Sequence, residues 1–472
     1  MIFVCGTDKD YNTWSSLGNT GWDYNSLLPF FKKFEGNLDQ DIVDYKNGQY
    51  HGTNGSLGVG RYGSSDPFAQ VLKDGFNQSG YKFLRDWNSK EYNGLVEVQG
   101  TIKGGERSSA GTAFVMPLKS NPNFKLMKGS FVEKVLFTGT KAIGVNIVTK
   151  NPDCLNIKVY ARKEVIISAG AFGTPKILLK SGIGRPADLT PFGIPVLRSS
   201  AVGENYQDHV KSVHFIKMNP DVRSQLVLDI GFDSLLYTVN RTGKFSNLNV
   251  MNFNAFINTT DTNATYPDVH YIFYRFEKSQ EFIQDVLKRL GFKQEYIDQL
   301  AAVNNDYEIL MVHNEVNNPV AKGTVKLRST NVYDYPKITT NWLNNANDAD
   351  TILRGYKKLE ALVLTPAFQN ASAEFIKINI TECNPLPYPS DAYRKCYVKY
   401  FTASEWHQSG TAKMGPLTDP NAVVDPRLRV IGIQSLRVAD ASIMPNVPTS
   451  NTQCPTYMIG EKAAAMIQQD NP

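Results

Sequence analysis

The stretch VIISAGAFGTPKILLKSGIG, residues 165–184, joins a short apolar run to an apolar helix through a turn of small residues. The run VII predicts a buried strand, and the turn that follows contains only Ser, Ala and Gly. Thr174 suits a helix N-cap, Pro175 the first helical position, and Gly182 the residue beyond the helix. A strand, a small-residue turn and a helix in this order let a ligand approach the backbone closely. We therefore expect an α/β fold with a ligand at this turn.

The flanking sequence extends this domain and adds a second one. Upstream, FKLMKGSFVEKVLF, KAIGVNIV and LNIKVYARKEV predict successive strands because they are rich in Val, Ile and Phe. Residues 210–400 mix strands, such as HYIFYRF and GTVKLRS, with a helix in DADTILRGYKKLEALVL that Asp348 or Asp350 would cap. The last 70 residues return to the first pattern, with a strand in SLRVADASIMP and a helix in PTYMIGEKAAAMI that starts near Pro455.

Composition excludes several classes of protein. The 472 residues carry a formal net charge of +5 and no block of like charges, so nucleic acid is not an expected partner. No apolar run reaches the roughly 18 residues that a membrane span needs, and the start MIFVCGTDKDYNTW is not a signal peptide. Seven Asn-x-Ser/Thr sequons favour a secreted protein only slightly, because the chain is rich in Asn.

The five cysteines show neither a CxxC motif nor a zinc-ligand spacing. Cys383 and Cys396 are close enough in sequence to be bridged. The odd total leaves at least one thiol free.

One of the six histidines stands in WHQSGTAKMG, residues 406–415. Taken alone, His407 is more readily interpreted as a hydrogen-bonded core residue than as a base. Asn451 follows 44 residues later, directly before the start of the last helix. An imidazole is mostly neutral at pH 7 and can accept a proton, whereas a carboxamide can donate to a developing negative charge.

Three segments together resemble the glucose–methanol–choline (GMC) oxidoreductases, and most closely their insect glucose dehydrogenase-like group. They are DYNTWSSLGNTGWDYNSLLPFFKKFEG, SAGAFGTPKILLKSGIGRPADLTPFGIPV ending in VGENYQDH, and WHQSGTAKMG through NTQCPTYMIGEKAA. The resemblance runs in family order from about residue 3 to residue 467. It implies an FAD-dependent enzyme that oxidises the CH–OH group of an alcohol or sugar and passes electrons to a quinone or to oxygen.

The resemblance also implies residue roles. His407 would take the substrate proton as hydride passes to flavin N5, and Asn451 would orient the alcohol. Contacts with FAD would come from Val132 at the adenine, from Asp440 and Ala441 beside the ribityl and pyrophosphate, and from Thr452 and Gln453 at the pyrimidine edge. No metal is expected, since His51, His214, His270 and His313 show no ligand spacing. Cys383 and Cys396 fit a family disulfide.

In domain terms, the resemblance implies an FAD-binding domain formed by residues 101–205 and 401–472. Residues 1–100 and 206–400 would form a substrate-binding domain, with connecting and lid segments, around a mixed or antiparallel sheet. The motif ENYQDH sits where these domains join. We therefore expect Asp208 and His209 to fix that junction rather than to act as a catalytic pair, and Glu204 to be structural as well.

One expected element is not found in the sequence. A family member should carry a strand, a GxGxxG turn and a helix, followed by an acidic residue about 20 residues further on. The glycines at 55, 58, 60 and 63 follow no strand, and Cys5 stands where an arginine is usual. The sequence is thus expected to lack the N-terminal βαβ unit, as an incomplete version of a full-length secreted enzyme. The alternative is a catalytically inactive binding or structural protein that does not retain FAD.

Overall fold

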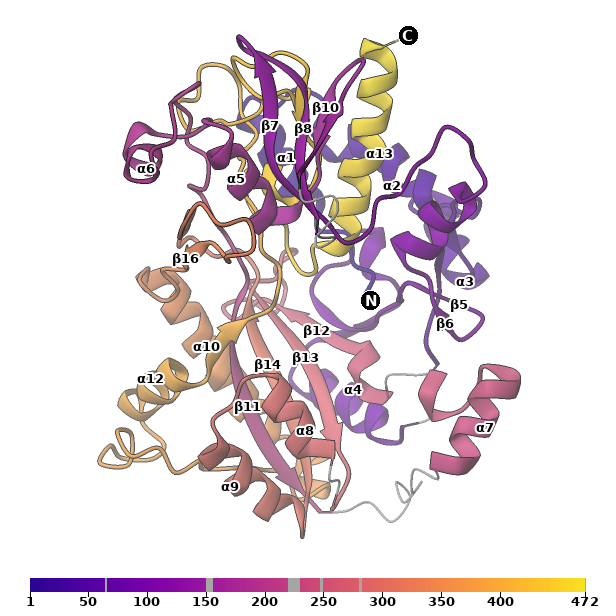
Figure 1. Ribbon diagram of the computed structural model, residues 1–472. Helices are drawn as coiled ribbons and strands as arrows, with labels where there is room; N and C mark the ends of the chain where they lie inside the picture. The colour runs from indigo at the N-terminus through magenta and orange to yellow at the C-terminus, as the bar shows by residue number, and fades with distance from the viewer. Residues whose placement is uncertain (64–65, 150–155, 220–229, 247–248, 280–281, 472) are drawn as a thin grey trace.

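The computed structural model describes residues 1–63, 66–149, 156–219, 230–246, 249–279 and 282–471, which form two stacked halves (Figure 1). The upper half in that view contains the elements nearest the two ends of the chain. The lower half is built around one large sheet. This division confirms an α/β fold with a second sheet domain.

The upper half combines a parallel strand pair with an antiparallel three-stranded sheet. The pair is β10 (Val165–Ile167) and β19 (Leu436–Val438), in register from Val165 opposite Leu436. The other strands are β7 (Ser130–Thr138), β8 (Lys141–Thr149) and β9 (Asn156–Tyr160). The main helices are α1 (Asp8–Ser16), α2 (Tyr24–Phe34), α5 (Gly170–Lys180), α6 (Pro186–Leu189) and α13 (Gln453–Asp470).

Helix α5 begins one turn earlier than the sequence predicted. Its N-cap is Ala169, so Thr174 lies inside the helix and does not cap it. The Thr174 hydroxyl instead donates to Asp440 Oδ2 at 2.5 Å, which ties α5 to the end of β19. Gly182 does lie just beyond the helix, with φ +81°, a conformation that favours glycine. The strand, turn and helix of residues 165–184 are therefore confirmed, with a different cap.

The lower half is an eight-stranded mixed sheet, and only β3 and β4 pair in parallel. The strands run in the order β17 (Glu374–Phe375), β11 (Val210–Met218), β14 (Glu308–Val316), β13 (Val269–Phe276), β12 (Phe253–Ile257), β4 (Gly94–Glu97) and β3 (Lys82–Leu84), and β18 (Thr402–Ser404) also pairs with β11. Successive residues of β14 enter different apolar clusters: Leu310 belongs to the cluster of Leu72 and Leu359, whereas Ile309 belongs to that of Leu287 and Leu300. Both faces of the sheet are therefore covered.

The helices of this half are mostly short and amphipathic. They are α4 (Phe68–Gln78), α7 (Ile230–Asn240), α8 (Phe282–Arg289), α9 (Gln294–Asn304), α10 (Ala346–Val363), α11 (Pro366–Asn370) and α12 (Asp391–Tyr400). The cap predicted for α10 is wrong, because Asn345 caps it. The buried Asp348 instead accepts hydrogen bonds from the backbone amides of Val320 and Ala321.

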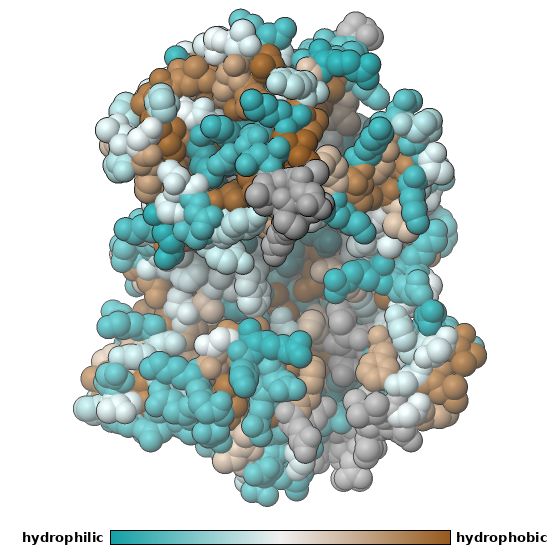
Figure 2. Space-filling view, viewed as in Figure 1, coloured by the Kyte–Doolittle hydropathy of each residue, from teal (hydrophilic) through white to brown (hydrophobic). Residues whose placement is uncertain are grey.

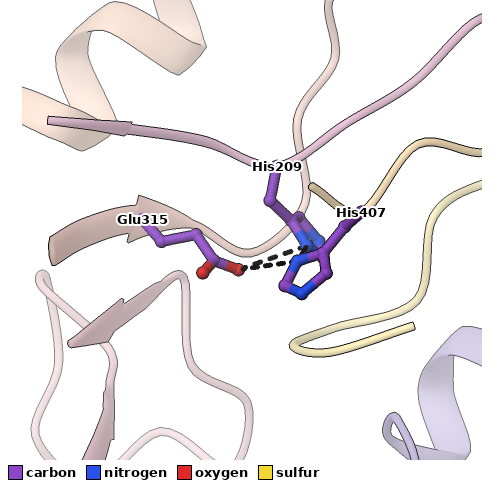
Figure 3. A group of neighbouring side chains, drawn as sticks. All are labelled: His209, Glu315 and His407. Atoms are coloured by element: carbon purple, nitrogen blue, oxygen red, sulfur yellow. Dashed lines mark hydrogen bonds and ion pairs between the residues drawn. The ribbon is translucent and has the colours of Figure 1, made fainter. Parts of the chain in front are cut away.

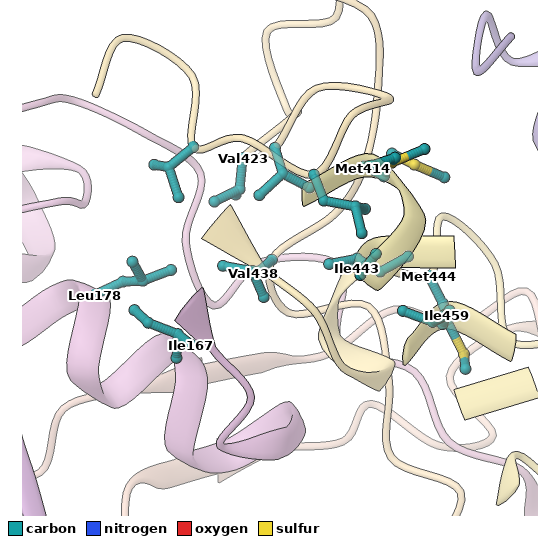
Figure 4. Packing of buried hydrophobic residues seen from close by; sticks show 14 of the residues in the cluster. Ile167, Leu178, Met414, Val423, Val438, Ile443, Met444 and Ile459 are labelled. Carbon is teal, nitrogen blue, oxygen red and sulfur yellow. The ribbon is translucent and has the colours of Figure 1, made fainter. Parts of the chain in front are cut away.

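The core of the upper half differs from the predicted domain division at one point. Figure 4 shows its centre, where side chains of β10, α5, β19 and α13 meet. Buried residues between Phe3 and Val59 belong to the same cluster, and α2 packs along α13. Residues 3–59 thus pack with the segments assigned to the FAD-binding domain, because α2 packs along α13 and α1 packs on α2. The other domain boundaries stay predictions.

Two disulfides link cysteines, one pair far apart in the sequence and one pair close together. The predicted bridge between Cys383 and Cys396 is present. A second bridge joins Cys5 to Cys454, across 449 residues, and the sequence did not indicate it. Cys154 lies outside the described residues. Disulfides form and persist in oxidising compartments.

One buried histidine, His51, links two acidic side chains. His51 Nδ1 lies 2.7 Å from Glu35 Oε1, and His51 Nε2 lies 3.0 Å from Asp86 Oδ2. Burial lowers the pKa of His51, but the hydrogen bonds to Asp86 and Glu35 outweigh it and raise the pKa to about 10. This histidine is therefore held as a cation, and the resulting stabilisation depends on pH.

We expect the free energy of unfolding to fall as pH rises through about 10, where the folded protein loses the His51 proton. A raised folded-state pKa gives stabilisation that is complete below the unfolded value near 6.5. Urea unfolding at pH 6 and pH 10.5 measures the difference, which should shrink in His51→Gln. His214→Gln is the matched control, since among the described residues the His214 ring hydrogen-bonds the Ser212 hydroxyl and no acidic side chain. An equal fall in wild type and His51→Gln would contradict the prediction.

The surface seen in Figure 2 is mostly hydrophilic, with a brown patch at the lower right over α7. The exposed apolar side chains there are Phe232, Leu235 and Val239. Among the described residues, none of the helices combines the length and apolar character that would span a bilayer.

Candidate active site

His407 and Asn451 meet, although 44 residues separate them. Asn451 Nδ2 lies 2.9 Å from His407 Nε2. The Asn451 oxygen accepts a hydrogen bond from the Ser450 hydroxyl, so its amide nitrogen is the group that faces the imidazole. An amide N–H can only donate, and His407 Nε2 is therefore the acceptor, which means that this nitrogen carries no proton. The arrangement presents an unprotonated imidazole nitrogen whose lone pair faces a hydrogen-bond donor.

The other nitrogen of His407 is fixed by a second histidine. His209 Nε2 lies 2.9 Å from the backbone oxygen of Asn317, which accepts only, so His209 carries its proton on Nε2. His209 Nδ1 is then an acceptor, and it lies 2.8 Å from His407 Nδ1. His407 must donate its Nδ1 proton to His209. Both contacts thus assign the same tautomer to His407, with the lone pair on Nε2.

A buried carboxyl, that of Glu315, lies beside the two rings (Figure 3). Glu315 Oε1 is 3.2 Å from His209 Nδ1 and 3.9 Å from His407 Nδ1. Burial raises the pKa of the Glu315 carboxyl above its ordinary value. Burial also lowers the pKa of His407 far below its ordinary value, and the neighbouring His209 lowers it further. His407 is therefore neutral at physiological pH.

Asp208 holds the main chain of this site. Its Oδ1 accepts from the His407 backbone amide at 2.8 Å, and its Oδ2 accepts from the hydroxyls of Ser404 and Tyr206. Glu204 pairs with Lys326 and Arg185 at the surface of the same junction. Both residues have the structural surroundings that the sequence suggested. His209 differs, because its ring touches His407 directly.

The pairing register of the large sheet brings these groups together. Glu315 on β14 lies opposite Lys211 on β11 and opposite His270 on β13. Because side chains alternate along a strand, His209 and Lys211 share a face, as do His313 and Glu315. The polar side chains therefore gather at one end of the sheet. Titratable side chains two residues apart, in HVK at 209–211 and HNE at 313–315, are the signal by which the sequence could have revealed Glu315.

His209, Glu315 and His407 are also near enough to one another to be considered as metal ligands. Two nitrogen ligands of one zinc ion lie about 3.3 Å apart, given Zn–N bonds of about 2.0–2.1 Å. The two Nδ1 atoms are closer, at 2.8 Å, which is a hydrogen-bond distance. The geometry favours a hydrogen-bonded chain over a metal centre.

The segment after Asn451 has features that fit an anionic ring system. Helix α13 starts at Gln453, and among the described residues the side chain of its N-cap, Thr452, does not cap the first amides of the helix. The buried Oε1 of Gln453 has no hydrogen-bond partner among the described residues. Open amides at a helix start attract negative charge. Thr452 and Gln453 thus remain predicted contacts of a flavin.

The turn after β10 can admit a cofactor. Gly170 has φ +76°, and an added Cβ there would meet nothing within 4 Å. Asp440 accepts from the Gly170 amide at 2.9 Å and from the Ser442 amide at 2.8 Å. Asp440 therefore shapes the turn with its own oxygens, and Ala441 follows it, partly buried. Val132 lies half-buried in β7 opposite Ile147, and its predicted adenine contact stays a prediction.

Comparison with known proteins places this architecture in one class. Models of the GMC oxidoreductase family match residues 1–211 and 319–460. Glucose dehydrogenase [FAD, quinone] of Drosophila pseudoobscura pseudoobscura is 32% identical, over 99% of this chain and 72% of its own length. Ecdysone oxidase of Spodoptera littoralis is 31% identical, over 99% and 76%.

A solved structure gives the same fold. An FAD-dependent oxidoreductase from Chaetomium thermophilum matches with a TM-score of 0.82 and 24% identity, over 100% of this chain and 84% of that one. The chain belongs to the GMC oxidoreductase family, and its cofactor is FAD. Because the N-terminal family model matches from residue 1, the expected lack of an N-terminal dinucleotide-binding unit is not confirmed.

Proposed function

We propose that the protein oxidises the CH–OH group of an alcohol or sugar, with His407 as the base and Asn451 as the group that orients the substrate. The observation that carries this proposal is the tautomer of His407, whose unprotonated Nε2 faces the Asn451 amide at 2.9 Å. A hydroxyl that replaces this direct contact could give its proton to Nε2 and accept a hydrogen bond from Asn451 Nδ2. FAD, when bound, supplies the acceptor for the hydride.

Side chains of the protein account for the proton transfer in the reaction. A base with a lowered pKa is ready at neutral pH, and a positioned base contributes about 10²–10⁴-fold. Asn451 does not titrate, so it can stabilise a developing alkoxide without competing for the proton. Asp208 fixes the His407 backbone, and His209 fixes the ring.

The cofactor contacts proposed are Thr452 and Gln453 at the start of α13, Asp440 and Ala441 at the turn, and Val132 in β7. The electron acceptor is a quinone or oxygen, as the names of the two relatives suggest for those proteins. Two disulfides support an extracellular location for the protein.

The test is the visible spectrum of the purified chain supplied with FAD and freed from excess cofactor. We expect flavin bands that bleach without oxygen when a panel of sugars, primary alcohols and hydroxysteroids is added. His407→Ala should keep the bands and lose the bleaching. A protein that takes up no flavin would instead be the inactive scaffold that the sequence left as an alternative.

A further inference from the structure

The hydrogen-bond chain behind His407 does not end at His209. His270 Nε2 lies 2.7 Å from Asn254 Oδ1, and the Asn254 amide nitrogen donates to the Met251 oxygen. Asn254 Oδ1 is thus an acceptor, and His270 must carry its proton on Nε2. The unprotonated Nδ1 of His270 then faces Glu315 Oε2 at 3.4 Å.

Glu315 therefore lies between two imidazole lone pairs. His209 Nδ1 and His270 Nδ1 both carry lone pairs, and a carboxylate between them would bring three acceptors together. The Glu315 side chain is fully buried, and neither of its oxygens accepts a hydrogen bond of good geometry from the described residues. A buried, uncompensated charge is very costly. A proton on Glu315 Oε2, directed at His270, resolves the conflict.

The nearest cation, Lys211, does not compensate a negative charge on Glu315. Lys211 Nζ lies 2.7 Å from Glu405 Oε2, and His313 Nδ1 contacts the same oxygen at 3.1 Å. Burial raises the pKa of Glu405, but the contacts with His313 and Lys211 outweigh it and hold the pKa well below its ordinary value, so Glu405 is the ionised partner of Lys211. Burial lowers the pKa of His270 to about 3, so that ring stays neutral. Asp208 also faces this region, but its oxygens are engaged by Ser404, Tyr206 and His407.

We propose that Glu315 is a neutral carboxylic acid that supports His209 when this histidine receives the positive charge formed as His407 takes the substrate proton. The proposal rests on the proposed function. In the step, the alcohol O–H bond breaks and an N–H bond forms at His407 Nε2. The His407 Nδ1–H bond then breaks as an N–H bond forms at His209 Nδ1, so the charge moves one ring inward. Glu315 Oε1, 3.2 Å from His209 Nδ1, then accepts a hydrogen bond from the new N–H group.

In this scheme His209 and Glu315 are positioning residues, because neither touches the substrate. Together they let the two imidazoles, His407 and His209, gain a proton without contact with water. The carboxyl contributes shape and a fixed acceptor rather than a negative charge. This distinguishes it from the ionised aspartate that supports histidine in the serine protease triad.

The test compares two replacements of Glu315. Glutamine keeps an oxygen toward His209 and an N–H donor toward His270, so Glu315→Gln should retain kcat to within about threefold. Glu315→Leu, which has neither, should lower kcat at least tenfold with little change in KM. His209→Gln should lower kcat similarly, and the double variant His209→Gln/Glu315→Leu should be no worse than the poorer single variant, since both act in one unit. His214→Gln, on β11 but bonded to Ser212, is the control.

A second readout needs no turnover. The infrared spectrum of the resting protein at neutral pH should contain the C=O band of a protonated carboxyl, which disappears in Glu315→Gln and persists in His214→Gln. Persistence of the full band in Glu315→Gln overturns the proposal, as does a Glu315→Gln variant as slow as Glu315→Leu. If wild type retains the band but oxidises no alcohol, the proposed function fails while the assignment of this proton stands.

Discussion

Replacing His407 by alanine is expected to lower kcat by about 10²–10⁴-fold, the usual contribution of a positioned base. The loss follows from the removal of Nε2, the unprotonated nitrogen that faces Asn451. FAD binding should survive, because the proposed cofactor contacts lie at the α5 turn and at the start of α13. Steady-state kinetics with the flavin spectrum as a measure of bound cofactor separates the two effects.

Asn451→Ala provides a graded comparison, with a loss of about 10²-fold, the effect of removing one donor to a developing oxyanion. His214→Ala controls for the loss of a buried imidazole, since His214 packs between Tyr356 and Tyr397, away from His407. Near-normal turnover in His407→Ala would remove His407 from the role of base.

Removing the bridge between Cys5 and Cys454 is expected to lower the free energy of unfolding by about 2–5 kcal/mol. The bridge spans 449 residues, so it removes much conformational entropy from the unfolded chain. It also anchors the start of α13, three residues after Asn451. The double variant Cys5→Ser/Cys454→Ser, studied by urea unfolding, measures the change.

The bridge between Cys383 and Cys396 is the matched control. It closes only 13 residues, so the chain-entropy relation assigns it roughly half the stabilisation of the longer loop. Cys383→Ser/Cys396→Ser should therefore be the less destabilised of the two double variants. A larger loss in this short-loop variant would show that unfolded-chain entropy does not govern these bridges.

The sequence predicted the elements whose signals are local. The strand, turn and helix at 165–184 and the last helix are present because apolar periodicity and small residues define them within a few positions. The cap positions failed at Thr174 and Asp348, because both side chains bond distant groups, Asp440 in one case and the backbone of residues 320–321 in the other. Capping residues and buried anchors have the same residue types, so sequence alone does not distinguish them.

The site was predicted in part for a related reason. His407 and Asn451 were identified through the family resemblance, and their contact is present. The sequence predicts a structural role for His209 and does not indicate Glu315, because their relation depends on the pairing of β11 with β14, which are about 100 residues apart. Likewise, the bridge from Cys5 to Cys454 depends on α13 packing beside the first residues of the chain. Such register is fixed by tertiary packing rather than by local pattern.

The bond between Cys5 and Cys454 turns almost the whole polypeptide into a covalent ring. A protease that cuts one exposed loop anywhere inside that ring converts it to an open but still single molecule. The two pieces would separate on a denaturing gel only after a reducing agent is added. A clipped sample can therefore keep its mass and its assembled active site, and the damage stays hidden under oxidising conditions.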